Sequence, residues 1–180
     1  ALQHALAYAA DRKQGATPLS KTGAIVDHAD VRRMLALMRA EVFAARSIAL
    51  SCAVAIDMAT ATGRAEWQAR AALLTPIAKA HGTDIGCEVS HLGVQIHGGM
   101  GFIEETGAAQ FSRDARITPI YEGTNGIQAM DLVGRKMQDN GDAAFRLIDE
   151  VQRSTEGARA TLPDLAGDVW QASEALREAT

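Results

Sequence analysis

The chain has 180 residues, of which 47% are hydrophobic and 4% aromatic, and its formal net charge at pH 7 is −4. This length suffices for one domain with a real core, and a composition poor in aromatic residues and proline favours packed helices over sheets. The acidic balance argues against a nucleic-acid surface, which needs a basic face. No apolar run approaches the roughly 20 residues of a membrane span. Because the sequence begins at Ala1 rather than Met, we expect a fragment whose true N-terminus and any targeting signal lie outside it.

The first half of the chain predicts two helices separated by a loop. The first helix is expected over residues 1–14, ending before Gly15. Residues 16–30 are irregular and lead to an N-cap at or near Asp30. A long helix is expected over residues 31–60, because its apolar residues recur at alternating steps of four and three and form a nearly straight seam. The seam consists of Val31, Leu35, Met38, Val42, Ala45, Ala49, Cys52 and Ile56.

A second long helix is expected over residues 65–94. Its apolar stripe consists of Leu74, Ala78, His81, Ile85, Val89, Leu92 and Ile96. Pro76 predicts a kink, or a fresh helix start with Thr75 as its cap. Because no acid or nucleophile lies close to His81 in sequence, we interpret it as a satisfied core or interface histidine. Cys52 and Cys87 lack metal-ligand spacing, so no metal site is expected.

The remainder of the chain predicts shorter elements. A short helix over residues 104–115 carries charged residues that we interpret as an internal salt-bridge cluster fixing a loop. They are Arg113, Asp114 and Arg116. Pro119 predicts an extended segment over residues 117–120. The next helix runs to Met137, and two amphipathic helices follow, separated by turn residues at 140–141 and at 157–163.

Glycines, amides and one carboxylate are concentrated between residues 95 and 128. The segment reads Q-I-H-G-G-M-G-F, then R-D-A-R-I, then Y-E-G-T-N-G-I-Q. Bare backbone at Gly98 and Gly99 can closely approach a phosphate or a ribose. A dinucleotide fingerprint is excluded, because that motif follows a strand and here a helix precedes the glycines.

Glu122 stands beside Gly123, just before a helix that Thr124 or Asn125 could cap. Two interpretations of this carboxylate follow from the residues alone. It either favours the positive end of the helix dipole, or it is a general base aimed into a cleft where Gly123 lets a substrate approach.

The three motifs together resemble the C-terminal helical domain of the acyl-CoA dehydrogenase family. The resemblance covers roughly residues 1–136 and implies an all-α, antiparallel four-helix bundle over residues 1–138. Residues 139–180 would then be an additional helical region packed on the bundle or extending it. Such an extension, together with the segment I-V-D-H-A-D-V-R-R-M-L, is similar to a longer bacterial branch of the family, which includes enzymes of the methylthiopropionyl type.

The resemblance implies an FAD-dependent α,β-dehydrogenation of an acyl-CoA thioester. Glu122 matches the base that takes the α-proton while a hydride passes to the flavin, and Tyr121 and Gly123 match residues at the thioester end of the substrate. The residues that match cofactor contacts are Arg12, Gln95, Gly98, Gly99, Thr124 and Asn125. Arg12 and the glycine motif would reach a flavin bound mainly to a neighbouring subunit. In the family Phe-Gly follows this arginine motif, whereas this chain has Gln14-Gly15.

The resemblance also implies a homodimer or a dimer of dimers, an electron-transferring flavoprotein as acceptor, and a bacterial, cytoplasmic enzyme. We expect the fragment alone to bind FAD weakly or not at all, because most flavin contacts lie in other domains of the family. Three alternatives stay open. Arg12 could be a solvated cation at a helix end. The enzyme could be an acyl-CoA oxidase that uses oxygen directly. The chain could also be a non-catalytic helical interaction module, or a member of the DNA-damage-associated branch.

Overall fold

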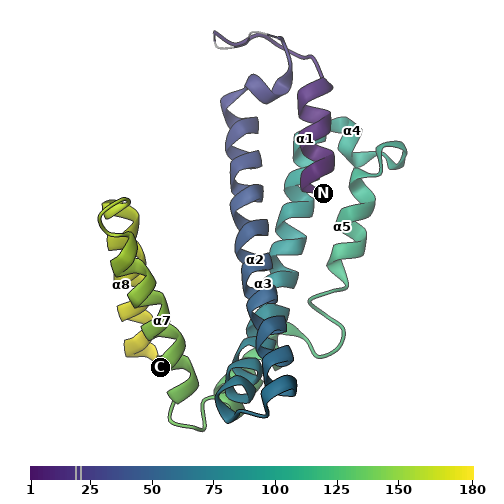
Figure 1. The fold of residues 1–180 in the computed structure, drawn as a ribbon. Helices are drawn as coiled ribbons and strands as arrows, with labels where there is room; N and C mark the ends of the chain where they lie inside the picture. The colour runs from purple at the N-terminus through teal and green to yellow at the C-terminus, as the bar shows by residue number, and fades with distance from the viewer. Residues whose placement is uncertain (19, 21) are drawn as a thin grey trace. The chain divides into compact units, whose positions relative to one another are not determined.

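The structure is a computed structural model that describes residues 1–18, 20 and 22–180. Regular structure in these residues is helical, and the pairing of Lys13 with Ala24 is an isolated bridge (Figure 1). The elements are α1 (Leu2–Asp11), η1 (Ile25–Asp27), α2 (Ala29–Thr62), α3 (Ala65–His97), α4 (Gly99–Phe102), η2 (Glu104–Thr106), α5 (Ala108–Arg116), α6 (Asn125–Asp131), η3 (Leu132–Lys136), α7 (Asp142–Ala158) and α8 (Pro163–Ala179).

These helices form two compact units. The first unit combines residues 1–50 with residues 77–128, and the second combines residues 51–76 with residues 129–180. Every residue that the sequence assigns to a functional site lies in the first unit. The division into a bundle over residues 1–138 and an added C-terminal region stays a prediction.

The core of the first unit joins α1, α2 and α3. Its buried residues are Ala5, Ala9, Met34, Leu35, Met38, Val89 and Ile96. Met38 is completely buried, which confirms the predicted apolar seam in the first half of α2. A Cβ on Gly93 would lie 3.5 Å from the Cβ of Ala1, so α1 packs closely on α3 at this point. Further along the seam, Ile56 is half exposed.

The two long helices are confirmed, and the structure narrows one predicted detail of each. α2 begins at Ala29, so Asp30 lies inside its first turn and is not the N-cap. α3 continues through Pro76 without a fresh start. The hydroxyl of Thr75 is not a cap, because it donates a hydrogen bond back to the carbonyl of Ala71 at 2.7 Å.

α2 is the exception to the expectation that no apolar stretch approaches a membrane span. By length and composition alone this helix is apolar enough to cross a membrane. The observation is weak evidence, because the core helix of a soluble protein passes the same test. The first half of α2 supplies Met34, Leu35 and Met38 to the core of the first unit.

The segment after α5 is a turn and not the predicted extended strand. Ile117 is in the right-handed helical region, and the N–H of Ile120 donates to its carbonyl at 2.9 Å. Proline restricts the residue immediately before it, which is Thr118, and leaves Ile117 free to continue the helical path. The result is a tight turn that leads the chain from α5 into the Tyr121–Thr124 segment.

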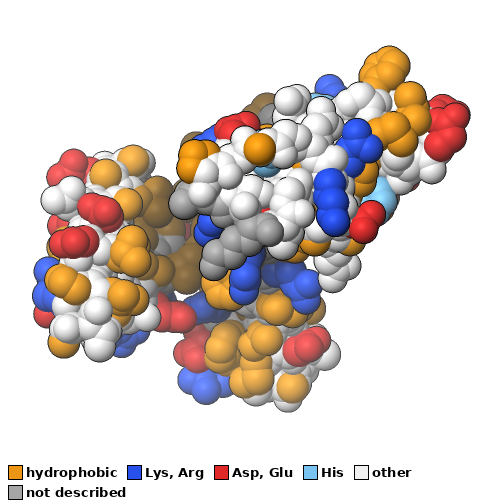
Figure 2. Space-filling model, turned by 90° about the horizontal axis from the view of Figure 1, so that it is seen from above, with side chains coloured by type: hydrophobic (Ala, Val, Ile, Leu, Met, Phe, Trp, Pro, Cys, Tyr) orange, Lys and Arg blue, Asp and Glu red, His pale blue; other side chains and the backbone are white. Residues whose placement is uncertain are grey.

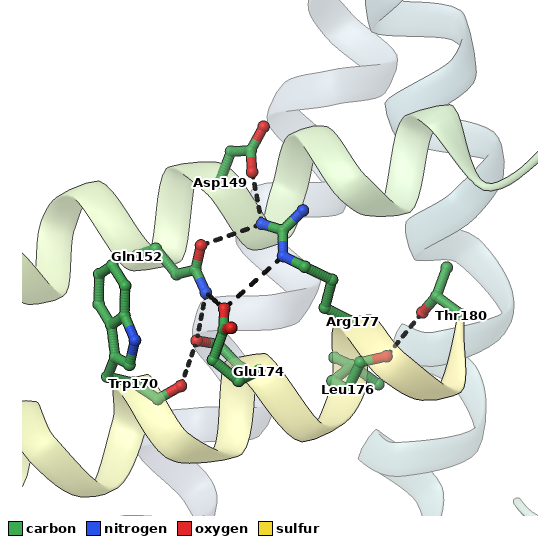
Figure 3. A network of polar contacts seen from close by, with 8 residues as sticks. Asp149, Gln152, Trp170, Glu174, Leu176, Arg177 and Thr180 are labelled. Atoms are coloured by element: carbon green, nitrogen blue, oxygen red, sulfur yellow. Dashed lines mark hydrogen bonds and ion pairs between the residues drawn. The ribbon is translucent and has the colours of Figure 1, made fainter.

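The second unit contains the two amphipathic helices that the sequence predicts, α7 and α8, and they pack against each other as a hairpin. Asn140 and Gly141 have φ values of 59° and 76° and reverse the chain before α7. Figure 3 shows the polar contacts between the helices: the buried Gln152 donates to Glu174 and to Ser173. Its carbonyl oxygen accepts a hydrogen bond from Arg177 at 3.0 Å, and Arg177 also pairs with Asp149. The hairpin is therefore held by a polar network as well as by apolar packing.

Candidate functional site

A strained turn presents Glu122 to solvent. Glu122 has φ +55° and Gly123 has φ +83°, so two consecutive residues are left-handed. For a residue other than glycine this conformation costs on the order of 1 kcal/mol, and it persists only where the surrounding structure fixes it. Tyr121 and Glu122 are both exposed. The turn therefore holds an accessible carboxylate in an unfavourable backbone conformation.

Side chains of α3 hold this turn in place through hydrogen bonds. The ammonium group of Lys79 donates to the carbonyl oxygen of Gly123 and to Oδ1 of Asn125, each at 2.8 Å. The amide nitrogen of Asn125 donates to the carboxylate of Asp84 at 2.7 Å and to the hydroxyl of Thr83 at 3.1 Å. Lys79 and Thr83 are one helical turn apart on α3 and Asp84 follows directly, and all three contact the side chain of Asn125.

Residues at the start of α6 also hold the turn in place. The hydroxyl of Thr124 accepts a hydrogen bond from the N–H of Ile127 at 3.4 Å, which confirms the predicted helix cap. The side chain of Gln128 donates to the carbonyl of Gly123 at 3.4 Å. A Cβ on Gly123 would lie 3.0 Å from that side-chain nitrogen, which is the end of a flexible chain and can move aside, so it is the left-handed backbone that calls for glycine here.

A second cluster surrounds the glycine loop at the C-terminal end of α3. A groove of about 300 Å³ lies between α3 and α5. Its lining residues are His91, Val94, Gln95, Phe102, Ala109, Ser112 and Arg113. Gly98 has φ +60°, and the positions of an added Cβ at Gly98 and at Gly99 are open. The exposed backbone of both glycines can therefore approach a ligand.

The tip formed by α4 and η2 projects beside this groove. Phe102 is 82% exposed, and Met100 and Ile103 are also partly exposed. Figure 2, which looks down on this end of the first unit, shows hydrophobic and acidic side chains gathered together at the tip. Arg113 lies within 3.6 Å of Glu104. The sequence predicts a cluster of Arg113, Asp114 and Arg116, but Asp114 accepts a hydrogen bond from Gln110 at 2.6 Å and forms no ion pair with either arginine among the described residues.

His97 lies buried beneath the glycine loop. Its Nδ1 atom is 2.7 Å from the carbonyl oxygen of Gly93. A carbonyl only accepts hydrogen bonds, so the neutral ring carries its proton on Nδ1, and the buried Nε2 has no partner among the described residues. Burial lowers the pKa of His97, and the nearby His4 lowers it further, whereas the hydrogen bond to Gly93 raises it. The ring of Tyr8 stacks on His97 and ties α1 to this loop.

Arg12 stands at the end of α1, where the helix gives way to extended backbone. Its side chain is exposed and hydrogen-bonds to the side chain of Gln14 at 3.2 Å. The guanidinium is therefore open both to solvent and to an anionic ligand.

Apart from Arg12, the sequence-predicted site residues thus fall into two separate clusters. Lys79, which contacts the turn of Glu122, and Gln95, which lines the groove, are about 24 Å apart at the rise per residue of an α-helix. Sequence reasoning did not single out Lys79, Thr83 or Asp84. The available signal was that these polar residues lie off the apolar stripe of α3, with Lys79 and Thr83 one helical turn apart. Among the described residues, no group of three or more His, Cys, Asp or Glu side chains could hold a metal ion.

Comparison with known proteins identifies the family. The sequence profile described as "Acyl-CoA dehydrogenase, C-terminal domain" matches residues 1–137. The 3-methylmercaptopropionyl-CoA dehydrogenase of Ruegeria pomeroyi is 49% identical over 164 residues, which are 87% of this chain and 28% of that protein. The chain therefore belongs to the acyl-CoA dehydrogenase family and corresponds to its all-α C-terminal domain.

Solved structures agree with this assignment. Butyryl-CoA dehydrogenase of Megasphaera elsdenii is 31% identical, with a TM-score of 0.62 over 76% of this chain and 32% of that chain. ACDH-11 of Caenorhabditis elegans in complex with C11-CoA has a TM-score of 0.85 over 98% of this chain and 29% of that chain. At 20% identity this second likeness shows the fold alone. The chain spans about a third or less of the length of these relatives.

Proposed function

We propose that this chain is the C-terminal part of an FAD-dependent acyl-CoA dehydrogenase in which Glu122 is the catalytic base. The observation that carries the proposal is the accessible Glu122 carboxylate on a left-handed turn that α3 and α6 hold in place. Backbone outliers that the surrounding structure fixes in this way cluster at active sites. Membership of the family supplies the reaction class.

The reaction removes two hydrogens from neighbouring carbons of an acyl-CoA thioester. A carboxylate oxygen of Glu122 takes the α-proton, the β-carbon gives up a hydride, and a double bond forms between the two carbons. FAD, when bound, accepts the hydride. Because the α-proton of a thioester is weakly acidic, the base works only when it is closely positioned and shielded from water. Glu122 is exposed in this chain, so the substrate, the cofactor and the rest of the enzyme have to supply that shielding.

The residues around the glycine loop fit the adenosine-diphosphate half of FAD. The groove offers the cation of Arg113, the aromatic ring of Phe102 and the amide of Gln95, while Gly98 and Gly99 expose their backbone. A phosphate suits the cation and the bare N–H groups, and an adenine ring suits an aromatic neighbour.

The spacing of the two clusters supports an oligomeric enzyme. A separation of about 24 Å along α3 suggests that the clusters serve two different flavins. The turn of Glu122, with Thr124, would then face one flavin. Gln95, the two glycines and Arg12 would face a flavin held mainly by a neighbouring subunit. The side chain of Asn125 is occupied by α3, so we assign it to fixing the turn beside that first flavin. This arrangement requires a homodimer or a dimer of dimers.

The likeness to the Ruegeria pomeroyi relative points to a short acyl-CoA thioester of the 3-methylmercaptopropionyl type as the substrate. We further propose a bacterial cytoplasmic enzyme that passes its electrons to an electron-transferring flavoprotein.

The test uses the full-length protein that contains this chain, purified as wild type and as Glu122→Gln. Turnover of a panel of acyl-CoAs is measured with an artificial electron acceptor, and the flavin spectrum reports bound cofactor. We expect Glu122→Gln to keep its flavin and to lose about 10²–10⁴-fold in kcat, the range for loss of a general base. Glu178→Gln, at an exposed position on α8, is the matched control.

Three results would count against parts of this proposal. Turnover that survives in Glu122→Gln places the base elsewhere. A wild-type protein that contains no flavin removes the enzyme interpretation altogether. Oxygen consumption by the wild type without an added acceptor identifies an oxidase, which uses the same base.

A further inference from the structure

We propose that Lys79 is a positioning residue for Glu122: it holds the turn that carries the base, and its loss lowers the rate of proton abstraction. This inference rests on the proposed function of Glu122. Lys79 is half-buried on α3, 44 residues before Gly123 in the chain, and its ammonium group reaches two acceptors of the turn.

The two contacts of Lys79 bracket the residue that caps α6. One acceptor is the carbonyl oxygen of Gly123 and the other is Oδ1 of Asn125, with Thr124 between them. Hydrogen bonds from a charged donor are roughly twice as strong as neutral ones. Lys79 holds the carbonyl of Gly123, the residue that follows Glu122, and so restricts rotation of the peptide group between Gly123 and Thr124. The position of the Glu122 carboxylate is restricted as a result.

The strain at Glu122 makes such an anchor necessary. A glutamate with φ +55° returns to a more favourable backbone conformation unless neighbouring contacts oppose that movement. Gly123 tolerates many conformations and cannot by itself hold its neighbour in place. The contacts of the turn with Lys79 and Gln128 are the hydrogen bonds that oppose the movement.

Lys79 also sets the orientation of the Asn125 amide. The oxygen of this amide faces the Lys79 ammonium, and its nitrogen faces the carboxylate of Asp84. The reversed amide would place its oxygen against that carboxylate and its nitrogen against the ammonium, so it is excluded. The Lys79 ammonium, the Asn125 amide and the Asp84 carboxylate form one hydrogen-bond network that connects α3 to the start of α6. Removing the Lys79 cation weakens the whole network.

The kinetic test compares Lys79→Met, Lys79→Arg and wild type in the full-length, FAD-loaded protein. A misplacement of about 1 Å at a reacting group can cost 10²-fold in rate, so we expect Lys79→Met to lower kcat by about 10- to 100-fold. The KM for acyl-CoA and the flavin content are expected to change much less than kcat, because most contacts to the flavin are expected in the other domains of the full-length protein. Lys79→Arg keeps a cation that can donate to both acceptors, and we expect partial recovery of kcat.

Two further measurements separate positioning from a general loss of structure. Hydrogen exchange of the Asn125 and Gln128 amides, which donate to Pro119 and Thr124, is expected to be at least tenfold faster in Lys79→Met. Core amides around Val89 are expected to exchange as in wild type. Arg64→Met removes a cation from an exposed site just before α3 and is the control for the loss of charge.

A double variant distinguishes failure of this inference from failure of the proposed function. If Glu122 is the base, adding Lys79→Met to Glu122→Gln changes kcat by less than about twofold, because the positioned group is already gone. Unchanged kcat and unchanged exchange in Lys79→Met overturn the role of Lys79 and leave Glu122 as the base. An equal fall of kcat, flavin content and core protection also overturns it, since Lys79 would then only stabilise the fold. Turnover that survives in Glu122→Gln overturns the proposed function, and with it the role of Lys79 in proton abstraction.

Discussion

The rings of Tyr8 and His97 stack with their centroids 4.2 Å apart and join α1 to the end of α3. The ring of His4 lies 4.8 Å from His97 on the same helix as Tyr8. His97 is directly followed by the glycine loop, so these contacts tie α1 to the residue from which the loop begins. The buried imidazole makes the contact sensitive to pH.

Lowering the pH is expected to destabilise the chain through His97. Its pKa is below the ordinary value of 6.5, chiefly because of burial and also because of His4. Between the folded pKa and 6.5 the unfolded chain binds more protons than the folded one. The contribution of His97 is therefore fully present above pH 6.5 and is lost as the pH falls through the folded pKa. Thermal unfolding measured from pH 8 to pH 5 checks this.

The matched variants are His97→Asn, which keeps a donor for the carbonyl of Gly93, and His91→Asn, at an exposed position on the same helix. His97→Asn is expected to be less stable at neutral pH and to lose less of its remaining stability between pH 6.5 and pH 5. An identical pH dependence in wild type and His97→Asn would contradict the assignment.

Gly101→Ala is expected to disrupt the packing of α4 on α3. A Cβ at Gly101 would lie 2.3 Å from the carbonyl oxygen of Val94 and 2.8 Å from the Cβ of His97, and neither is the end of a flexible side chain. Overpacking of this kind costs about 1–3 kcal/mol, which chemical denaturation measures. Gly86→Ala is the control, because an added Cβ there meets open space. Inside a helix that change is expected to stabilise by up to about 1 kcal/mol. Equal effects of the two substitutions would refute the steric account.

Apolar periodicity was sufficient to predict the long helices, because their buried faces repeat over many turns. The first half of α2 and the stripe of α3 place Met38 and Val89 in the core as expected. Local capping chemistry predicted Thr124 correctly. The turn at residues 117–120 was not predicted. Pro119 restricts only the residue directly before it, which is Thr118, and does not make the whole segment extended.

The network around the base could not be predicted from spacing. Lys79 and Gly123 are 44 positions apart, and Asp84 and Asn125 are 41 apart. Local sequence patterns report on neighbours within one helix or one turn, whereas these contacts depend on how the turn packs against α3. The left-handed conformation of Glu122 has the same origin, since glutamate has no local preference for it.

In the second unit, the pKa of Glu150 is expected to depend on its contact with Arg70. The hydrogen bond and the charge of Arg70 hold the pKa of Glu150 below its ordinary value of 4.5. The stabilisation that this pair provides is therefore present above pH 4.5 and lost as the pH falls through the folded pKa. An NMR titration of the Glu150 carboxyl carbon in Arg70→Met is expected to show a higher pKa than in wild type. Arg64→Met, which removes an exposed cation paired with Glu66, is the control and is expected to leave the pKa of Glu150 as in wild type.

Replacing the strained base is expected to stabilise the protein while it abolishes turnover. Asparagine tolerates the left-handed conformation far better than glutamate, so Glu122→Asn relieves part of the backbone strain at φ +55° without adding the flexibility of glycine.

A gain of at most about 1 kcal/mol raises the melting temperature of a chain of this size by at most roughly 2–4 °C. Differential scanning calorimetry of Glu122→Asn, with Glu105→Asn as the control at an exposed position of η2, measures this shift. A melting temperature at or below that of wild type would mean that the contacts of the turn with α3 already favour the left-handed backbone at no cost. A higher one shows that the chain gives up stability to keep a carboxylate at this position, as expected of a residue retained for chemistry.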